Sequence, residues 1–172
     1  MRADAFWKTV TADRAGFLDR LIAVLAEHGI RYCVVGGQGV NAYADPVVSL
    51  DLDLAVAVDD VPRLEALMGE QFSVERFAHS LNVSAPSSDL RVQFQTDPTY
   101  ASFLQRAAVR DVLGIPLPVA HVEDVLQGKI WAARDPAPPS KRQKDLADIA
   151  RLIEAFPALR PRVPGDVLAR LL

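Results

Sequence analysis

The most constraining feature of this 172-residue chain is the stretch from Val47 to Val58, in which leucines alternate with aspartates. Its alternating members are Leu50, Leu52 and Leu54 on one side and Asp51 and Asp53 on the other. Apolar and polar residues that alternate with a period of two predict a half-buried strand whose apolar side faces a core. We therefore expect a β-strand within residues 47–58, in a sheet with at least one covered face.

The two carboxylates of this strand need a physical reason. Because Asp51 and Asp53 are two residues apart, their side chains project from the same face, where like charges repel each other. A hard divalent cation relieves this repulsion, since Mg²⁺ prefers one or two carboxylates together with phosphate oxygens. Carboxylates are poor strand formers, but an exposed polar strand face is the other explanation. The pair therefore predicts either a Mg²⁺ site or a solvated strand face.

Two glycines follow the short apolar strand predicted over residues 32–35. Gly36 and Gly37 lack a Cβ atom, so a ligand can approach the backbone closely at the start of the helix expected over residues 38–44. A tight strand-to-helix turn would use the same residues, so the pattern alone is ambiguous. It matches neither the dinucleotide-binding G-x-G-x-x-G motif nor a Walker A lysine loop, which excludes those two classes.

The remaining pattern predicts one α/β domain with helices at its end. The hydrophobic share of 50% and the charged share of 24% are typical of globular chains. We expect an α/β core over residues 1–120 and a helical extension over 121–172, packed as one unit. Further strands are expected over residues 72–77, 81–84, 90–95 and 109–113. One helix is expected to end at Gly29, and others to span residues 62–69, 101–106, 122–133, 141–155 and 166–172. Residues 114–118 are expected to form a turn-rich link.

Charge and cysteine content exclude several other classes. The net charge of −3 is incompatible with a globally basic nucleic-acid-binding surface. One cysteine, Cys33, rules out an intrachain disulfide, and its apolar neighbours predict a core position. No apolar run approaches the roughly 18 residues of a membrane span. We therefore expect a soluble, cytoplasmic protein without a membrane partner.

Taken together, the glycine pair and the D-x-D motif resemble the signature of the nucleotidyltransferase superfamily with the DNA-polymerase-β-like fold. The stretch is most similar to the bacterial branch of abortive-infection type IV toxin nucleotidyltransferases, and also to the short antibiotic nucleotidyltransferases that act on lincosamides. Lys129 and the segment Lys141 to Asp148 look like later motifs of the toxin branch. The resemblance covers roughly residues 30 to 155. It implies a minimal nucleotidyltransferase fold: a small mixed sheet flanked by helices, with a C-terminal helical extension.

The resemblance also implies a reaction and its residues. A nucleoside monophosphate would move from an NTP, such as ATP, to the hydroxyl of a tRNA end, a small molecule or a protein side chain. Asp51 and Asp53 would bind Mg²⁺ or Mn²⁺. An antitoxin or a second copy of the chain would be a partner. The expected nucleotide-binding residues are Gly36, Gly37, Gln38, Ser49, Lys129 and Lys144.

The chain departs from the family pattern where many relatives have a third carboxylate. Gln93 is the expected occupant of that position, and its amide can orient a hydroxyl but cannot take its proton. Nearby acidic substitutes are Glu75, Asp89 and Asp97. Lys129 and Asp145 are the candidates that would compensate as catalytic residues. The alternative is a catalytically degenerate member that binds a nucleotide or a protein without turnover.

The lysines of the last third allow two explanations each. Lys129 lies beside the apolar stripe of its helix and is either solvated or reaches a phosphate. Lys144 and Asp148 have the i,i+4 spacing of a helical ion pair. The basic start of that helix is therefore either a charged face or a patch that meets phosphates. Ser49, at the start of the D-x-D strand, likewise either begins the strand or contacts a phosphate.

Overall fold

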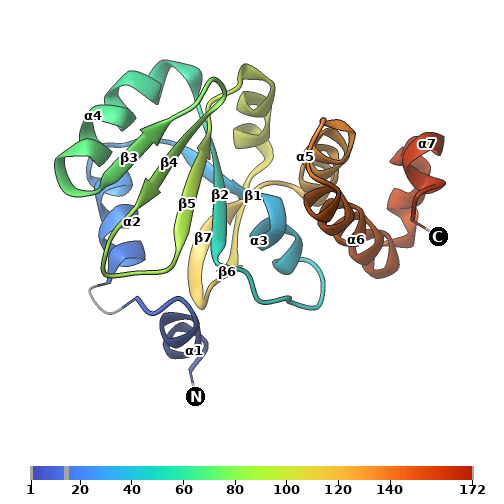
Figure 1. The fold of residues 1–172 in the computed structure, drawn as a ribbon, viewed down its shortest axis with the longest axis horizontal. Coiled ribbons are helices and arrows are strands. Elements are labelled where there is room, and N and C mark those ends of the chain that lie inside the picture. Colours follow the sequence, from blue (N-terminus) through green and yellow to red (C-terminus); the bar gives the residue numbers. More distant parts are fainter. Residues whose placement is uncertain (1, 14–15, 172) are drawn as a thin grey trace.

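The computed structural model describes residues 2–13 and 16–171, and in these residues seven strands form one mixed sheet (Figure 1). The strand order is β3-β4-β5-β2-β1-β7-β6. Strand β2 runs antiparallel to β1 and parallel to β5, while β7 runs parallel to β1. The small mixed sheet predicted from the sequence is confirmed. The strands are β1 Tyr32–Val35, β2 Asp51–Val56, β3 Ser73–Arg76, β4 Ser80–Ser84, β5 Arg91–Gln95, β6 Ala108–Val112 and β7 Ile115–Val119.

Helices cover both faces of the sheet. The α-helices are α1 Ala3–Val10, α2 Phe17–Glu27, α3 Gly36–Asn41, α4 Val61–Gln71, α5 Val122–Arg134, α6 Pro139–Ala155 and α7 Gly165–Leu168. The 3₁₀ helices are η1 Val58–Asp60, η2 Pro98–Arg106 and η3 Pro157–Arg162. In Figure 1, α2 and α4 lie on one side of the sheet, and α5, α6 and α7 lie together on the other side of α3.

Two apolar clusters hold these layers together. Leu52 and Leu54 of β2 belong to the cluster that contains the apolar residues of α2 and α4. Ala55, on the same side of β2 as the two aspartates, belongs to the second cluster, which includes apolar residues of α5 and α6. Cys33 is fully buried in that second cluster, as predicted. The aspartate face of β2 is therefore covered by the C-terminal helices rather than solvated along its whole length.

Several predicted boundaries are wrong. Residues 47–50 precede β2 instead of belonging to it, and the helix after β1 starts at Gly36 and ends at Asn41. The segment 114–118 lies almost wholly in β7, and residues 101–106 form a 3₁₀ helix. The N-terminal helix α1 was not predicted. The predicted terminal helix 166–172 ends at Leu168, and Leu172 lies outside the described residues.

Strand β7 escaped prediction because it contains two prolines, which cannot donate a ladder hydrogen bond. Pro116 and Pro118 pair with the edge strand β6, whereas the register with β1 is recorded only at Val119. Leu113 and Gly114 have positive φ values of 54° and 82°, so they form the tight turn of the β6–β7 hairpin.

None of the helices within residues 2–13 and 16–171 combines the length and the apolar character needed to cross a bilayer.

Candidate active site

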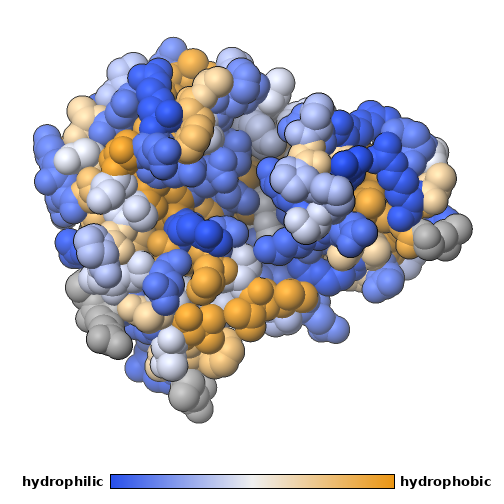
Figure 2. Space-filling model, viewed as in Figure 1, coloured by the Kyte–Doolittle hydropathy of each residue, from blue (hydrophilic) through white to orange (hydrophobic). Residues whose placement is uncertain are grey.

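A cavity of about 470 Å³ lies between the sheet and α6. Its size is within the usual range of small-molecule sites, about 300–1,000 Å³. In the space-filling view of Figure 2, hydrophilic side chains border this hollow, and a hydrophobic strip lies along the α3–β2 connection, where Val47 and Val48 are exposed. The sequence-predicted residues that line the cavity are Gly37, Ser49, Asp51, Asp53, Gln93, Lys129, Lys144 and Asp145.

The two glycines have different local environments. Gly36 has a φ of 66°, and a Cβ atom there would collide with the carboxylate of Asp53, whose Cγ lies 2.9 Å from that position. The cause is the sheet register, which sets Asp53 directly opposite Val35, the residue before Gly36. Gly37 has ordinary φ, a Cβ atom there would make only an ordinary 3.8 Å contact with Oδ2 of Asp148, and the residue lines the cavity. Gly36 thus makes room for Asp53, while Gly37 leaves backbone accessible to a ligand.

Asp53 lies half-buried on the floor of the cavity. Burial raises the pKa of Asp53 to about 6; Lys129 lowers it, and the charge of Asp51 raises it further. A buried carboxylate with a raised pKa attracts an added cation strongly. The cation would offset the cost of burying the Asp53 charge and the repulsion between Asp53 and Asp51.

Asp51 is more exposed and already has a cationic partner. The Nε atom of Arg91 on β5 lies 2.8 Å from Oδ1 of Asp51. The main-chain N–H of Asp51 donates to the hydroxyl of Ser49 at 3.2 Å, so the Ser49 side chain supports the start of β2. The D-x-D pair thus comprises one carboxylate bound to an arginine and one facing the cavity.

The neighbouring strands continue the Asp53 row with amides. Gln93 on β5 lies opposite Asp53, and Asn82 on β4 lies opposite Gln93. Both amides line the cavity. None of the alternative acidic residues at positions 75, 89 and 97 is among the described residues that line it. The strand position next to the D-x-D pair is therefore occupied by Gln93. Glu75 on β3 lies opposite Asn82, two strands away from Gln93, and does not line the cavity.

Lys129 is buried, which excludes a solvated lysine, one of the two explanations that the sequence allowed. Its Nζ atom lies 3.0 Å from Oδ1 of Asp145 and 2.8 Å from Oδ2 of Asp148. Burial alone would lower the pKa of Lys129, but the two aspartates outweigh burial and the pKa is raised. The predicted ion pair between Asp148 and Lys144 does not form among the described residues, because Asp148 instead binds Lys129 and Arg151.

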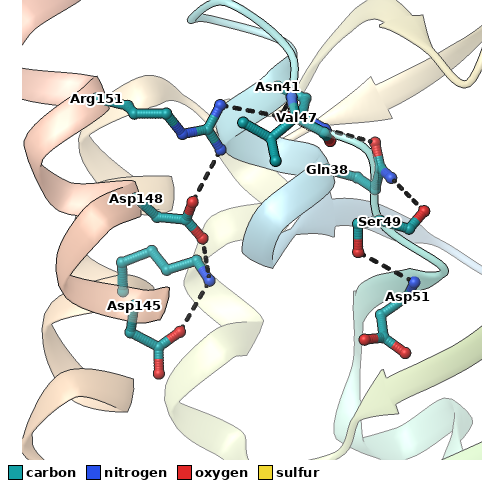
Figure 3. A network of polar contacts seen from close by, with 9 residues as sticks. Gln38, Asn41, Val47, Ser49, Asp51, Asp145, Asp148 and Arg151 are labelled. Atoms are coloured by element: carbon teal, nitrogen blue, oxygen red, sulfur yellow. Dashed lines mark hydrogen bonds and ion pairs between the residues drawn. The ribbon is translucent and has the colours of Figure 1, made fainter. Parts of the chain in front are cut away.

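A chain of polar contacts continues from Asp148 to the start of β2 (Figure 3). Arg151 donates to Asp148 at 2.8 Å, to the side-chain oxygen of Asn41 at 3.1 Å and to the carbonyl oxygen of Asp45 at 2.6 Å. Asn41 binds both main-chain polar groups of Val47. These contacts tie α6 to the α3–β2 connection.

Gln38 belongs to the same chain of contacts rather than to the cavity wall. Its side chain is buried, donates to the carbonyl oxygen of Ser49 at 3.3 Å and accepts from Asn41 at 3.1 Å. The structure therefore places Gln38 beneath the connection that leads into the D-x-D strand.

The donor set at the D-x-D pair fits a hard cation that shares its ligands with a substrate. Asp51 and Asp53 supply two carboxylates on one face, which suits Mg²⁺ or Mn²⁺. Within the described residues no group of three or more His, Cys, Asp or Glu side chains is placed to hold a metal. The remaining ligands would have to come from water and from substrate phosphates.

Among the polar and charged residues that line the cavity, the sequence did not single out Asn41, Asn82, Arg91, Lys141, Asp148 and Arg151 as site residues. Arg91 and Gln93 share the polar side of their strand, which is a signal that the sequence carries. Arg151 follows Asp148 by three residues, the spacing of neighbours on a helix. No local signal places Asn82 beside Gln93, since that contact depends on strand register.

Comparisons with known proteins agree with this geometry at the level of the fold. No protein-family model and no curated protein matches the sequence. The crystal structure of ANT(2″)-Ia in complex with adenylyl-2″-tobramycin matches with a TM-score of 0.63 and 16% identity, covering 91% of this chain and 97% of that one. The lincomycin-bound lincosamide antibiotic adenylyltransferase LnuA matches with a TM-score of 0.52 and 9% identity, covering 78% and 95%.

A third match is an antigenic nucleotidyltransferase-like protein from Paracoccidioides brasiliensis, with a TM-score of 0.51 and 20% identity, covering 86% of this chain and 75% of that one. Identities this low establish the fold alone. The chain therefore has the nucleotidyltransferase fold, as the resemblance of its motifs predicted.

Proposed function

We propose that this protein transfers a nucleoside monophosphate from an NTP to an acceptor hydroxyl. The observation that carries the proposal is convergence: the glycine turn, the D-x-D pair and the basic residues of α6 come from separate segments and line one cavity. The fold is one that adenylyltransferases use, although fold alone does not imply function.

Each part of the cavity has a task in this reaction. Asp51 and Asp53 would hold Mg²⁺ or Mn²⁺, which neutralises charge on the phosphates when bound. Lys141 and Lys144 are exposed cations at the start of α6, and they would bind the triphosphate. Gly37 leaves the backbone open to it. The acceptor oxygen forms a bond to the α-phosphorus as the bond to pyrophosphate breaks.

The proton of the acceptor hydroxyl needs a destination, and Gln93 cannot take it. Asp145 is the candidate, because its Oδ2 atom is buried without a hydrogen-bond partner among the described residues while Oδ1 binds Lys129. The positive charge of Lys129 is already neutralised by two aspartates. We therefore propose that Lys129 positions Asp145 and does not bind the phosphates.

Thermal unfolding with Mg²⁺ and each of the four NTPs tests the binding part of this proposal without knowledge of the acceptor. A ligand at about 100 times its Kd stabilises the folded state by about 2.7 kcal/mol. We expect a Mg²⁺-dependent rise in Tm that Asp53→Asn abolishes. Asp59→Asn, at an exposed position outside the cavity, is the matched control and should keep the rise. Absence of a shift with every NTP would contradict the proposal.

A second candidate function is nucleotide binding without turnover. It is favoured by two observations, the amide of Gln93 beside Asp53 and the Arg91 guanidinium bound to Asp51. Release of pyrophosphate from a labelled NTP in the presence of candidate hydroxyl acceptors separates the candidates, since only the transferase breaks that bond as the acceptor oxygen bonds to the α-phosphorus. Gln93→Glu adds the missing carboxylate, and a large gain in Mg²⁺ affinity and turnover would identify the wild-type protein as the non-catalytic form.

We also propose that the protein is the toxin of a toxin–antitoxin pair and that it uses ATP or another NTP. The proposal is based on the resemblance of Lys129 and the segment 141–148 to toxin motifs. Growth arrest on expression, abolished by Asp53→Asn and relieved by a co-expressed neighbouring gene, would support that context. An antitoxin or a second copy of the chain would be the partner. Normal growth with fully folded wild-type protein would contradict the toxin assignment.

A further inference from the structure

The sheet wall of the cavity carries two uncharged amides side by side. Asn82 and Gln93 are register partners on β4 and β5, and Gln93 is in turn the register partner of Asp53. On the β5 side of Asp53, Gln93 is therefore the first neighbour in the row and Asn82 is the second.

The fold itself does not explain Asn82. Its Oδ1 atom is buried and has no hydrogen-bond partner among the described residues. Leaving a buried polar atom unpaired costs stability, and an apolar side chain on β4 would avoid that cost. Because Asn82 lines the cavity, its amide can gain the missing hydrogen bond from a ligand when the side chain turns toward the cavity.

The charges of the cavity exclude one class of ligand from this wall. Five cationic and four anionic side chains line the cavity: Arg91, Lys129, Lys141, Lys144 and Arg151 against Asp51, Asp53, Asp145 and Asp148. Three of the four carboxylates already bind a lysine or an arginine. Of these four, only Asp53 forms no ion pair with a described residue, and the proposed function assigns Asp53 to the metal. No carboxylate that lines the cavity is left to compensate the ammonium groups of a polyamine; Glu75, opposite Asn82 on β3, does not line the cavity.

We propose that Asn82 and Gln93 form the acceptor subsite, and that it takes an uncharged, hydroxyl-rich small molecule of the sugar type rather than a polycationic one. The inference rests on the proposed function, because it names the acceptor of that reaction. Each amide offers both donors and an acceptor, which match hydroxyl groups without requiring a charge. The acceptor hydroxyl would lie between Gln93 and the D-x-D pair.

Saturation-transfer-difference NMR tests the subsite by binding, which needs no turnover. The neutral probe is methyl β-D-ribofuranoside, and the polycationic probe is tobramycin, each with Mg²⁺ and a non-transferable α,β-methylene ATP. We expect the wild-type protein to give a riboside signal that excess tobramycin leaves unchanged. Asn82→Leu/Gln93→Leu should lose that signal. Its cooperative unfolding and the nucleotide-dependent rise in Tm should persist.

A second pair of variants tests whether the lack of free carboxylates excludes a polycationic acceptor. Asn82→Asp/Gln93→Glu places two carboxylates on the same wall, and charge-assisted hydrogen bonds should strengthen tobramycin binding by about tenfold or more over wild type. Gln95→Glu adds the same charge to β5 at a position that does not line the cavity, and it should leave tobramycin binding unchanged. Isothermal titration calorimetry gives the Kd values.

Three outcomes would overturn the inference: no riboside signal from the wild-type protein, a riboside signal that survives in Asn82→Leu/Gln93→Leu, or tobramycin binding to the wild type as tight as to the double carboxylate variant. Failure of the proposed function is distinguishable from these, because it appears as loss of the nucleotide-dependent rise in Tm in the wild-type protein itself. Repeating the riboside measurement without nucleotide separates the two results.

Discussion

At the scale of single residues, the glycine pair of the motif divides into two different requirements. Gly36 adopts a positive φ and leaves the space that the Asp53 carboxylate needs. Gly37 is helical and has no close contact around its missing Cβ. The sequence predicts the pair as one feature, and only the sheet register separates the roles.

We expect opposite effects from Gly36→Ala and Gly37→Ala on the free energy of unfolding. Alanine at position 36 would have to keep a left-handed backbone and displace Asp53, which costs roughly 2–4 kcal/mol. Alanine at position 37 would favour the helix and stabilise by up to about 1 kcal/mol. Urea unfolding measures both changes. Equal destabilisation by the two variants would show that the close approach of Gly36 to Asp53 is not the constraint.

Asp53 is the residue whose titration the fold alters most plainly. Because the pKa of Asp53 is raised to about 6 from its usual 3.8, the folded state binds the proton more tightly than the unfolded state. By linkage, the stability from this group is fully present below pH 3.8 and is lost as the pH rises through 6. At neutral pH without metal the charged carboxylate is therefore a destabilising feature.

Asp53→Asn should consequently stabilise the metal-free protein at pH 7.5. We expect about 1–2 kcal/mol, less than the full pKa shift implies because cavity water screens the charge, or a rise in Tm of about 2–6 °C. The difference from wild type should shrink at pH 4.5, where Asp53 is protonated in the folded protein. Thermal scans with EDTA at the two pH values measure it, and a pH-independent difference would count against the raised pKa.

At the scale of elements, prediction from sequence worked where local pattern and tertiary environment agree. Strand β1 has the predicted bounds. Helix α2 ends at Glu27 with Gly29 as the predicted C′ glycine, and Ile30 donates to the Leu25 carbonyl oxygen at 3.0 Å. Prediction failed where tertiary contacts determine the backbone conformation. Residues 47–50 look like strand, but Asn41 binds the main-chain groups of Val47 and Gln38 binds the carbonyl oxygen of Ser49, so pairing with β5 begins only at the Leu50 carbonyl oxygen.

The same reasoning applies to the site. Asp51, Asp53, Lys129 and Asp145 could be placed in one cavity from motif resemblance, whereas Asn82 and Arg151 could not, because their positions follow from strand pairing and from the packing of α6. Arg151 shows how an element contributes to the site from a distance. It joins Asp148 on α6 to Asn41 and to the carbonyl oxygen of Asp45, on the connection that leads to the D-x-D strand.

Arg151→Met should destabilise the protein by about 1–3 kcal/mol, because Oδ1 of Asp148 and the carbonyl oxygen of Asp45 lose their donor, while Lys129 still binds Oδ2 of Asp148. Hydrogen exchange should accelerate at residues 42–50 in particular. Arg162→Met removes an exposed arginine that pairs with Glu123 at 2.9 Å, and this control should change stability by less than about 1 kcal/mol. Unchanged exchange at residues 42–50 in Arg151→Met would argue against the tether.

At the scale of the whole molecule, the C-terminal helices and the sheet share both a core and a site. Cys33, Val35 and Ala55 of the sheet lie in one apolar cluster with residues of α5 and α6. Gly39 of α3 would place a Cβ 3.3 Å from Val125 of α5, so these two helices are in close contact. The predicted division at residue 120 therefore crosses a packed core, which argues for one cooperative unit.

Two tryptophans allow this cooperativity to be measured from both sides. Trp7 packs against the cluster that contains α2 and α4, and Trp131 packs against the cluster that contains α5 and α6. Trp131→Phe leaves fluorescence from the first region, and Trp7→Phe leaves it from the second. We expect each variant's tryptophan fluorescence and far-UV circular dichroism to share one urea midpoint, as two-state unfolding of a single domain requires. A fluorescence transition that precedes the circular dichroism transition in Trp7→Phe would instead mean that the helices unfold first. The cavity would then lose Lys129, Asp145 and Asp148 while the D-x-D strand stays folded. In that case the shared core would not hold α5 and α6 on the sheet, and ligand binding would be needed to keep them folded there.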